Sequence, residues 1–227
     1  MEILFEDEYI TVAIKPPDAL SEQTASQDGF ADLRAKRNPN EYVGVIHRLD
    51  RGVGGVMVYA RTPLAAARLS AAVQERTLKK EYLAIVHGEP QSKTGRLCDL
   101  LFHDRFKNKT FVVDRTRKGV KEAILDYEVQ NSIEHPEEGR LSLIRVSLLT
   151  GRTHQIRAHL SHIGHPLLGD GKYGVNREEK RHGYKYQALY AWRLQFDFPD
   201  ESGLLGYLNG REVRLDPEDI WFLKDFD

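Results

Sequence analysis

The chain has 227 residues with a hydrophobic content of 41%, enough to bury a sizeable core, and it holds no apolar run near the ~20 residues of a membrane span. Its 33 basic and 34 acidic side chains give a formal net charge of -1, so the total charge does not indicate a nucleic-acid binder. A single cysteine, Cys98, excludes an intramolecular disulfide and a thiolate-rich metal site.

The first predicted element is a β-hairpin. Two apolar runs, residues 2–5 and 9–14, are separated by an acidic triplet. Pro16 and Pro17 end the second strand because a proline ring cannot continue a hydrogen-bonded ladder. A short helix is expected around residues 30–37. The acidic start of the chain lacks the basic and apolar regions of a signal peptide, so we expect a cytoplasmic protein.

Residues 45–60, with the sequence VIHRLDRGVGGVMVYA, place charged residues and glycines between two apolar runs. In an extended strand, Arg48 and Asp50 would point to one face of the sheet. In a loop, the glycines would let the backbone bend or approach another segment closely. Spacing alone favours the simpler alternative, a structural ion pair between Arg48 and Asp50 at the end of a strand. Residues 56–59 then predict a buried strand.

A helix is predicted from Thr62-Pro63 to about Arg76. Threonine is a preferred N-cap, proline suits the first helical position, and the apolar side chains that follow recur at helical spacing. Residues 82–86 predict the next strand. Its tyrosine, Tyr82, would by itself be a core residue more often than a site residue.

The second half of the chain predicts mainly strands. They are expected at residues 125–129, 141–149 and 188–198. The alternation of the second of these slips at Leu143-Ile144, which predicts a β-bulge. A helix is expected over residues 153–163, and a helical turn over residues 217–222. Because strands outnumber helices and most neighbours can pair as hairpins, we expect an α+β fold: a mixed, mainly antiparallel sheet with flanking helices.

The segment from Thr150 to Arg157 joins a strand to a helix, with Arg152 just before the helix start. Helix N-termini carry partial positive charge, so an arginine there adds to a pocket that attracts anions. The anion could be a phosphate or a protein carboxylate such as that of Asp50. The alternative is a capped helix whose arginines are solvated.

Two further groups of ionisable residues stand out. Residues 105–121 contain seven basic side chains and one acidic side chain, which predicts a positive surface or an ordinary solvated one. Four histidines lie between His154 and His165, but no aspartate or glutamate lies among them. We therefore expect no metal site.

Five ordered segments together resemble the RluA-type family of RNA pseudouridine synthases. They are HRLD at 47–50, KEYLAIVHG at 80–88, TGRTHQIRAHL at 150–160, GHPLLGDGKYG at 164–174 and ALYAWRLQFDFP at 188–199. The resemblance runs from about Ile3 to Pro199. It implies the pseudouridine synthase catalytic fold, here as a single domain over residues 1–227 without an S4-type accessory domain, and as a monomer.

The resemblance also implies an activity, the isomerisation of uridine to pseudouridine in ribosomal or transfer RNA, without metal or organic cofactor. Asp50 would be the nucleophile, Tyr82 would stack on the flipped uracil and assist the proton step, and Arg152 would pair with Asp50. Arg48 would help to open the RNA. Further RNA contacts are predicted for His154, Gln155, Arg157, Lys107, Lys109, Arg117 and Lys118.

The chain departs from the family pattern at two places. Val53-Gly54 replace the Thr-Ser that often follows HRLD, and residues 15–22 lack the His-Pro of the KPxGxxVHP segment. The first departure leaves open a catalytically impaired RNA-binding or ribosome-assembly protein. A metal-dependent hydrolase built on the histidines is a weaker alternative. Which RNA and which uridine are modified does not follow from the sequence.

Overall fold

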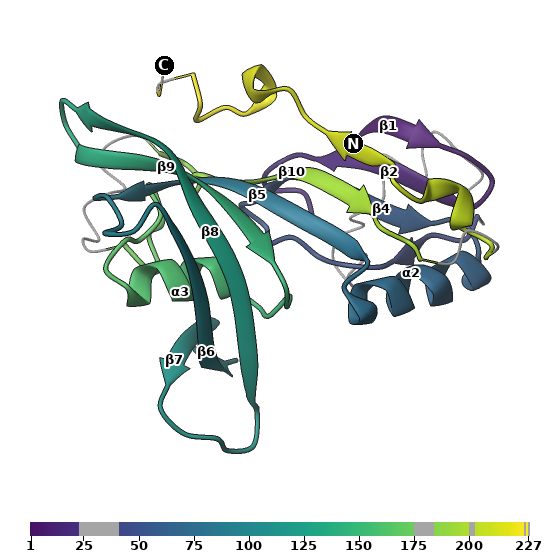
Figure 1. Ribbon diagram of the computed structural model, residues 1–227, viewed down its shortest axis with the longest axis horizontal. Helices are drawn as coiled ribbons and strands as arrows, with labels where there is room; N and C mark the ends of the chain where they lie inside the picture. The colour runs from purple at the N-terminus through teal and green to yellow at the C-terminus, as the bar shows by residue number, and fades with distance from the viewer. Residues whose placement is uncertain (23–40, 175–183, 200–202, 225, 227) are drawn as a thin grey trace. The chain divides into compact units, whose positions relative to one another are not determined.

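The computed structural model describes residues 1–22, 41–174, 184–199, 203–224 and 226 (Figure 1). The helix expected at 30–37 lies outside these residues. Residue contacts divide the chain into two compact units, Met1–Lys80 with Ala191–Asp216 and Glu81–Tyr190 with Pro217–Asp227. Each unit is built from two stretches of the chain. In the described part, no helix is long and apolar enough to cross a membrane.

The first unit contains a sheet of short strands. Its strands are β1 (Glu2–Glu6), β2 (Ile10–Lys15), β3 (Gly44–Val45), β4 (Gly54–Ala60), β10 (Leu189–Phe196, from Ala191 onward) and β11 (Glu212–Arg214). The order is β1-β2-β4-β10-β11, and β3 also pairs with β4. The predicted hairpin is β1–β2, an antiparallel pair whose turn is held by the Asp7 carboxylate, which accepts the N–H groups of Tyr9 and Ile10 at 2.7 and 2.8 Å.

Helix α2 (Pro63–Glu75) covers β4, whose seven residues are all buried (Figure 1). The predicted N-cap is confirmed, since the Thr62 hydroxyl accepts the N–H of Ala65 at 3.1 Å. The helix buries Ala65, Leu69 and Ala72, and it ends at Arg76 in the left-handed conformation. The small apolar residues of the predicted stripe therefore let the helix lie close to the sheet.

Strands β4 and β10 lie side by side, and their backbones come close together at Gly55. Its φ is +129°, and a Cβ atom at this position would lie 2.1 Å from the backbone oxygen of Ala191. No side chain fits in that space. Gly55 therefore permits the strand contact just downstream of the HRLD segment.

A Gly55→Ala variant should lose stability through this steric conflict. The matched control is Gly139→Ala, because Gly139 also has a positive φ of 72° but has open space at its Cβ position. We expect Gly55→Ala to lower the free energy of unfolding by about 1–3 kcal/mol more than the control does. Urea denaturation of both variants measures the difference, and equal losses would contradict the packing argument.

The second unit is a sheet of long antiparallel strands. They are β5 (Leu78–His87, from Glu81 onward), β6 (Thr94–Asp104), β7 (Lys109–Val113), β8 (Val120–His135) and β9 (Gly139–Leu148), in the order β5-β9-β8-β6-β7. Every adjacent pair in this series is antiparallel. With the short helix α3 (Gln155–His162) packed on β6 and β7, the α+β prediction is confirmed (Figure 1).

The predicted bulge lies on the partner strand. Val129 of β8 pairs with Ile144 of β9, and Asn131 pairs with Leu143, so the additional residue is Gln130. The irregular spacing in β9 therefore marked the correct ladder position but the wrong strand. At the end of the chain, the helical turn expected over 217–222 is a short 3-10 helix at Pro217–Asp219.

Candidate functional site

The HRLD segment forms a loop rather than a continuous strand. It lies between β3 and β4, and the N–H of Val53 donates to the carbonyl of Asp50 at 3.0 Å. This main-chain turn needs no side-chain hydroxyl, and Val53 itself is buried. Replacing the Thr-Ser of the family pattern with Val53-Gly54 therefore leaves the turn at Asp50 closed.

The segment after β2 holds the backbone on both sides of Asp50. The buried hydroxyl of Ser21 accepts the N–H of Leu49 and donates to its carbonyl, both at 3.0 Å. On the other side, the N–H of Asp18 donates to the carbonyl of Arg51 at 2.8 Å. Asp18 has a φ of +71°, which aspartate tolerates better than most residues, and it stands where the family pattern has glycine. The position of the Asp50 backbone is thus fixed twice.

Lys15 is buried beneath the same loop. Its side chain is fully inaccessible, and Nζ donates to the carbonyls of Pro16, Ala19 and Arg51 at 3.1, 2.9 and 3.3 Å. Burial lowers the pKa of Lys15 to about 8, although the negative charges of Asp50 and Asp18 act in the opposite direction. The ammonium group therefore joins the end of β2 to the residue that follows Asp50.

The lowered pKa of Lys15 predicts a pH dependence of stability. Between about pH 8 and its ordinary value of 10.5, the unfolded chain binds a proton that the folded chain does not, so this group makes stability rise with pH. Lys15→Met removes that contribution. The unfolding free energy of the wild type minus that of the variant should increase by up to about 3 kcal/mol across this window.

Urea unfolding at several pH values measures this difference. The matched control for loss of one positive charge is Lys79→Met, because Lys79 is half-exposed in the same unit and pairs with Asp197 at 2.5 Å. If the difference in unfolding free energy between the wild type and Lys15→Met stayed constant from pH 7.5 to 10.5, the lowered pKa of Lys15 would be contradicted.

The other charged residues of the loop do not form the ion pair that spacing favoured. Arg48 is exposed and pairs with Glu22 at 2.6 Å instead of Asp50. His47 is buried, and its Nε2 accepts the N–H of Val58 at 3.3 Å. Burial, together with the charge of Lys80, lowers the pKa of His47 to about 3, so this side chain is neutral and structural.

In the second unit, Tyr82 lies on β5 and is buried, whereas Arg152 is exposed at the entry to α3. The Nε of Arg152 donates to the carbonyl of Glu122 on β8 at 2.9 Å, and its backbone N–H donates to Oε1 of Gln155 at 3.0 Å. These bonds orient Arg152. Its pairing with Asp50 stays a prediction, because the two residues belong to different units.

Three residues with predicted RNA contacts have protein partners instead. Gln155 is buried and donates to the carbonyl of Ile124 at 3.0 Å. Arg157 is buried and binds Asp170 through two bonds of 2.7 and 2.8 Å. His154 is buried with its Nδ1 3.0 Å from the hydroxyl of Tyr173. Their burial and these bonds indicate structural roles, and their contact with RNA stays a prediction.

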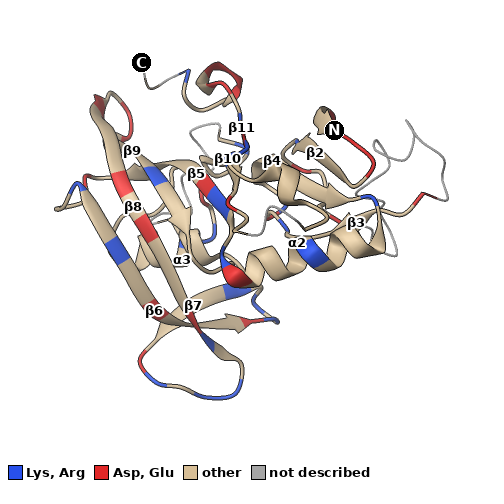
Figure 2. Ribbon diagram, turned by 45° about the vertical axis from the view of Figure 1, so that its right-hand side comes forward, with Lys and Arg blue, Asp and Glu red and all other residues tan. Residues whose placement is uncertain are grey.

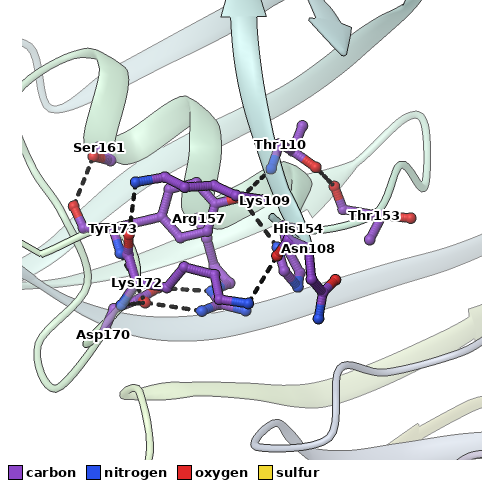
Figure 3. A network of polar contacts seen from close by, with 10 residues as sticks. All are labelled: Asn108, Lys109, Thr110, Thr153, His154, Arg157, Ser161, Asp170, Lys172 and Tyr173. Atoms are coloured by element: carbon purple, nitrogen blue, oxygen red, sulfur yellow. Dashed lines mark hydrogen bonds and ion pairs between the residues drawn. The ribbon is translucent and has the colours of Figure 1, made fainter. Parts of the chain in front are cut away.

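Asp170 lies at the centre of this network, and its role was not predicted from the sequence (Figure 3). Its carboxylate also accepts the backbone N–H groups of Lys172 and Tyr173 at 3.0 and 3.1 Å. Burial by itself would raise the pKa of Asp170, but Arg157 and these N–H groups hold it below its ordinary value. The signal available in the sequence was the GDGKYG segment, which supplies a carboxylate and turn-forming glycines together.

The remaining predicted RNA contacts lie around the β6–β7 hairpin. Lys107, Arg117 and Lys118 are exposed, while Lys109 is half-buried with its Nζ donating to the carbonyl of Lys172 at 2.7 Å. In Figure 2 the loop between β7 and β8 also carries lysine and arginine residues, which are drawn in blue. The basic run of the sequence therefore forms a largely exposed positive surface on one hairpin and the loop that follows it.

Comparison with known proteins identifies the family. A family model described as RNA pseudouridylate synthase matches residues 9–162. The chain belongs to this family. The match includes the Asp50 loop, Tyr82 and Arg152. It agrees with the RluA-type resemblance, since relatives named ribosomal large subunit pseudouridine synthase C and D also match.

Similar proteins come from bacteria and from human. An uncharacterised RNA pseudouridine synthase of Mycoplasma genitalium is 36% identical over 88% of this chain, which spans 63% of that relative. Ribosomal large subunit pseudouridine synthase C of Yersinia pestis is 32% identical over 87% of this chain, which spans 62% of it. The human RNA pseudouridylate synthase domain containing 1 shares the fold, with a TM-score of 0.74 at 23% identity over 95% of this chain and 83% of that one.

Proposed function

We propose that this RNA pseudouridine synthase family member isomerises uridine to pseudouridine in ribosomal or transfer RNA, with Asp50 as the nucleophile. The observation that carries the proposal is the Asp50 loop, which Ser21 and Asp18 fix on both sides of the aspartate. A nucleophile held in this way loses little freedom when substrate binds. Tyr82 and Arg152 are proposed as its partners, and Arg48 as the residue that helps to open the RNA.

The reaction is an internal rearrangement, so atoms balance without a co-reactant. The bond from uracil N1 to ribose C1′ breaks, the base turns, and a bond forms from C5 to C1′. The hydrogen on C5 leaves as a proton, and N1 takes up a proton. A carboxylate such as that of Asp50 can form the covalent intermediate by attacking the ribose or the base ring.

The uracil must leave the helical stack before the reaction and must not escape during it. Extruding a base costs a few kcal/mol. Stacking on an aromatic ring returns about 1–3 kcal/mol per base, which is the role proposed for Tyr82. Arg152, oriented by the carbonyl of Glu122, is proposed to keep the Asp50 carboxylate ionised through its positive charge.

Ribosomal RNA is the first substrate to test, because the Yersinia pestis relative is named for the large ribosomal subunit. The proposal places the enzyme in the cytoplasm with RNA as its partner. The catalytically impaired alternative rested on Val53-Gly54, and the main-chain bond that closes the turn at Asp50 argues against a loop geometry altered by this replacement. The monomeric state stays a prediction.

Pseudouridine mapping of total RNA from cells with and without the gene tests the proposal. At least one site should depend on the gene, and a plasmid copy of the wild type should restore it. A plasmid copy carrying Asp50→Asn should not restore it. Identical maps of ribosomal and transfer RNA in the two strains would contradict the proposal.

A further inference from the structure

Phe106 is a large aromatic side chain that is fully exposed. It lies in the turn between β6 and β7, with the exposed Arg105 before it and the exposed Lys107 after it. Single exposed apolar residues are common on protein surfaces and need no explanation by themselves. A planar ring between two cations is different, because this combination is found where proteins bind unpaired nucleotides.

The turn that presents Phe106 is held in one conformation. The carboxylate of Asp104 accepts the N–H groups of Phe106 and Lys107, each at 3.0 Å. Asn108 completes the turn with a φ of +43°. The backbone of Phe106 is therefore set by local hydrogen bonds, and an exposed ring on an ordered turn loses less entropy on binding than one on a loose loop.

The turn is also tied to the body of the second unit (Figure 3). The Nζ of Lys172 donates to the carbonyl of Asn108 at 2.7 Å, and the Nζ of Lys109 donates to the carbonyl of Lys172 at 2.7 Å. The N–H of Thr110 donates to the hydroxyl of the buried Tyr173 at 2.6 Å. Bonds from residues more than 60 positions away in the chain thus anchor the hairpin next to Phe106.

The charge around the turn favours a polyanion. Of the charged residues from 105 to 121, seven are basic and only Asp114 is acidic. The carboxylate of Asp114 lies 3.5 Å from Nε of its neighbour Arg115. The Nζ of Lys107 lies over the ring of Phe111, 5.9 Å from its centre. The one acid of this run thus faces a base, and the exposed cations next to Phe106 suit phosphate groups.

We propose that Phe106 is a stacking site for one unpaired base of the RNA, with Arg105 and Lys107 on the phosphates beside that nucleotide. The inference rests on the proposed function, which makes RNA the substrate class. An unpaired base is required because the bases of a duplex already stack on each other and offer no free face. The site therefore selects RNA with a loop, a bulge or an opened segment at the hairpin tip.

Fluorescence anisotropy with two labelled RNA probes tests this inference on the full chain. The probes are a single-stranded 12-mer of mixed sequence and a 12-base-pair duplex. Phe106→Ala and Phe106→Leu should weaken binding of the single strand roughly 5- to 150-fold, as expected for loss of one stacked base, and should change duplex binding less than twofold. Phe106→Trp should retain the affinity.

Salt dependence separates stacking from charge. Phe106→Ala should leave the slope of log affinity against log salt unchanged, whereas Lys107→Ala should reduce it by about 0.7. Leu64→Ala is the control, because Leu64 is also an exposed apolar residue but lies on α2. Its affinity for both probes should equal that of the wild type.

Wild-type affinity of Phe106→Ala for the single strand would overturn the inference. Full affinity of Phe106→Leu would do so too, because it would show an apolar contact without stacking, as in protein binding. An equal loss of affinity for the single strand and for the duplex would show that the site does not require an unpaired base. The assay involves no isomerisation: a chain that needs Phe106 to bind but forms no pseudouridine would refute the proposed function alone, and an active chain indifferent to Phe106 would refute this inference alone.

Discussion

Replacing Asp50 with asparagine should lower the rate of pseudouridine formation by at least about 10³-fold without unfolding the protein. Asparagine keeps the shape of the side chain, but its amide is neutral and is not a nucleophile. The loop should survive the change, because the bonds that hold it come from Ser21, Asp18 and the N–H of Val53 to main-chain atoms. Single-turnover assays on a susceptible RNA measure the rate, and thermal unfolding checks the fold.

The matched control is Asp18→Asn. Asp18 is a second carboxylate beside the same loop, 3.9 Å from Arg51, and its contact with the loop backbone is made by its own N–H group. An asparagine there keeps this bond and tolerates the positive φ. We expect its rate to stay within about tenfold of the wild type, an allowance for the changed charge near Asp50. An Asp50→Asn enzyme with more than a tenth of the wild-type rate would refute the assignment of Asp50 as the nucleophile.

The second large effect is expected on stability. Arg157→Ala should lower the free energy of unfolding by about 3–5 kcal/mol, because it leaves the carboxylate of Asp170 buried without its cation. For a chain of this size, such a loss corresponds to a fall in melting temperature of roughly 6–20 °C. Calorimetry or circular dichroism on heating measures it.

Arg96→Ala is the control for this variant. Arg96 makes the same kind of two-bond contact, with Asp126 at 2.6 and 2.8 Å, but both partners are exposed. Exposed ion pairs contribute less than about 1 kcal/mol to the free energy of unfolding, because water competes for the charges. The double variant Arg157→Met/Asp170→Leu should recover part of the loss, since it leaves no unpaired charge. Equal effects of Arg157→Ala and Arg96→Ala would contradict the argument.

Elements that depend on local signals were predictable from the sequence. The hairpin of β1 and β2 follows from two apolar runs and an acidic turn, and α2 follows from Thr62-Pro63 and a helical stripe. The strands β6 and β7 were not predicted. Strand β6 pairs with β8, which runs far beyond the predicted 125–129, and β7, only five residues long, pairs with β6. Both strands therefore depend on pairing with a neighbouring strand rather than on a clear pattern of their own.

The site was predictable only where a motif names the residue. Asp50, Tyr82 and Arg152 came from the family resemblance, and their roles stay proposals. Lys15 looked like the end of a strand, since nothing in its neighbours shows that three carbonyls converge on its ammonium group. Arg157 was predicted to contact RNA. Its ion pair with Asp170 was not predicted, because it depends on the path that the chain takes after α3. Long-range contacts of this kind leave no periodic trace in the sequence.

The bonds between Thr110 and its neighbours have a second consequence. In the strand order of the second unit β7 is the terminal strand, so it would expose main-chain groups that could pair with a strand of another molecule. At Thr110 the N–H is taken by the hydroxyl of Tyr173, and the Thr110 hydroxyl donates to the carbonyl of Thr153 at 2.8 Å. A foreign strand would first have to displace a buried tyrosine. The side chains that steady the hairpin therefore also protect this edge against intermolecular aggregation.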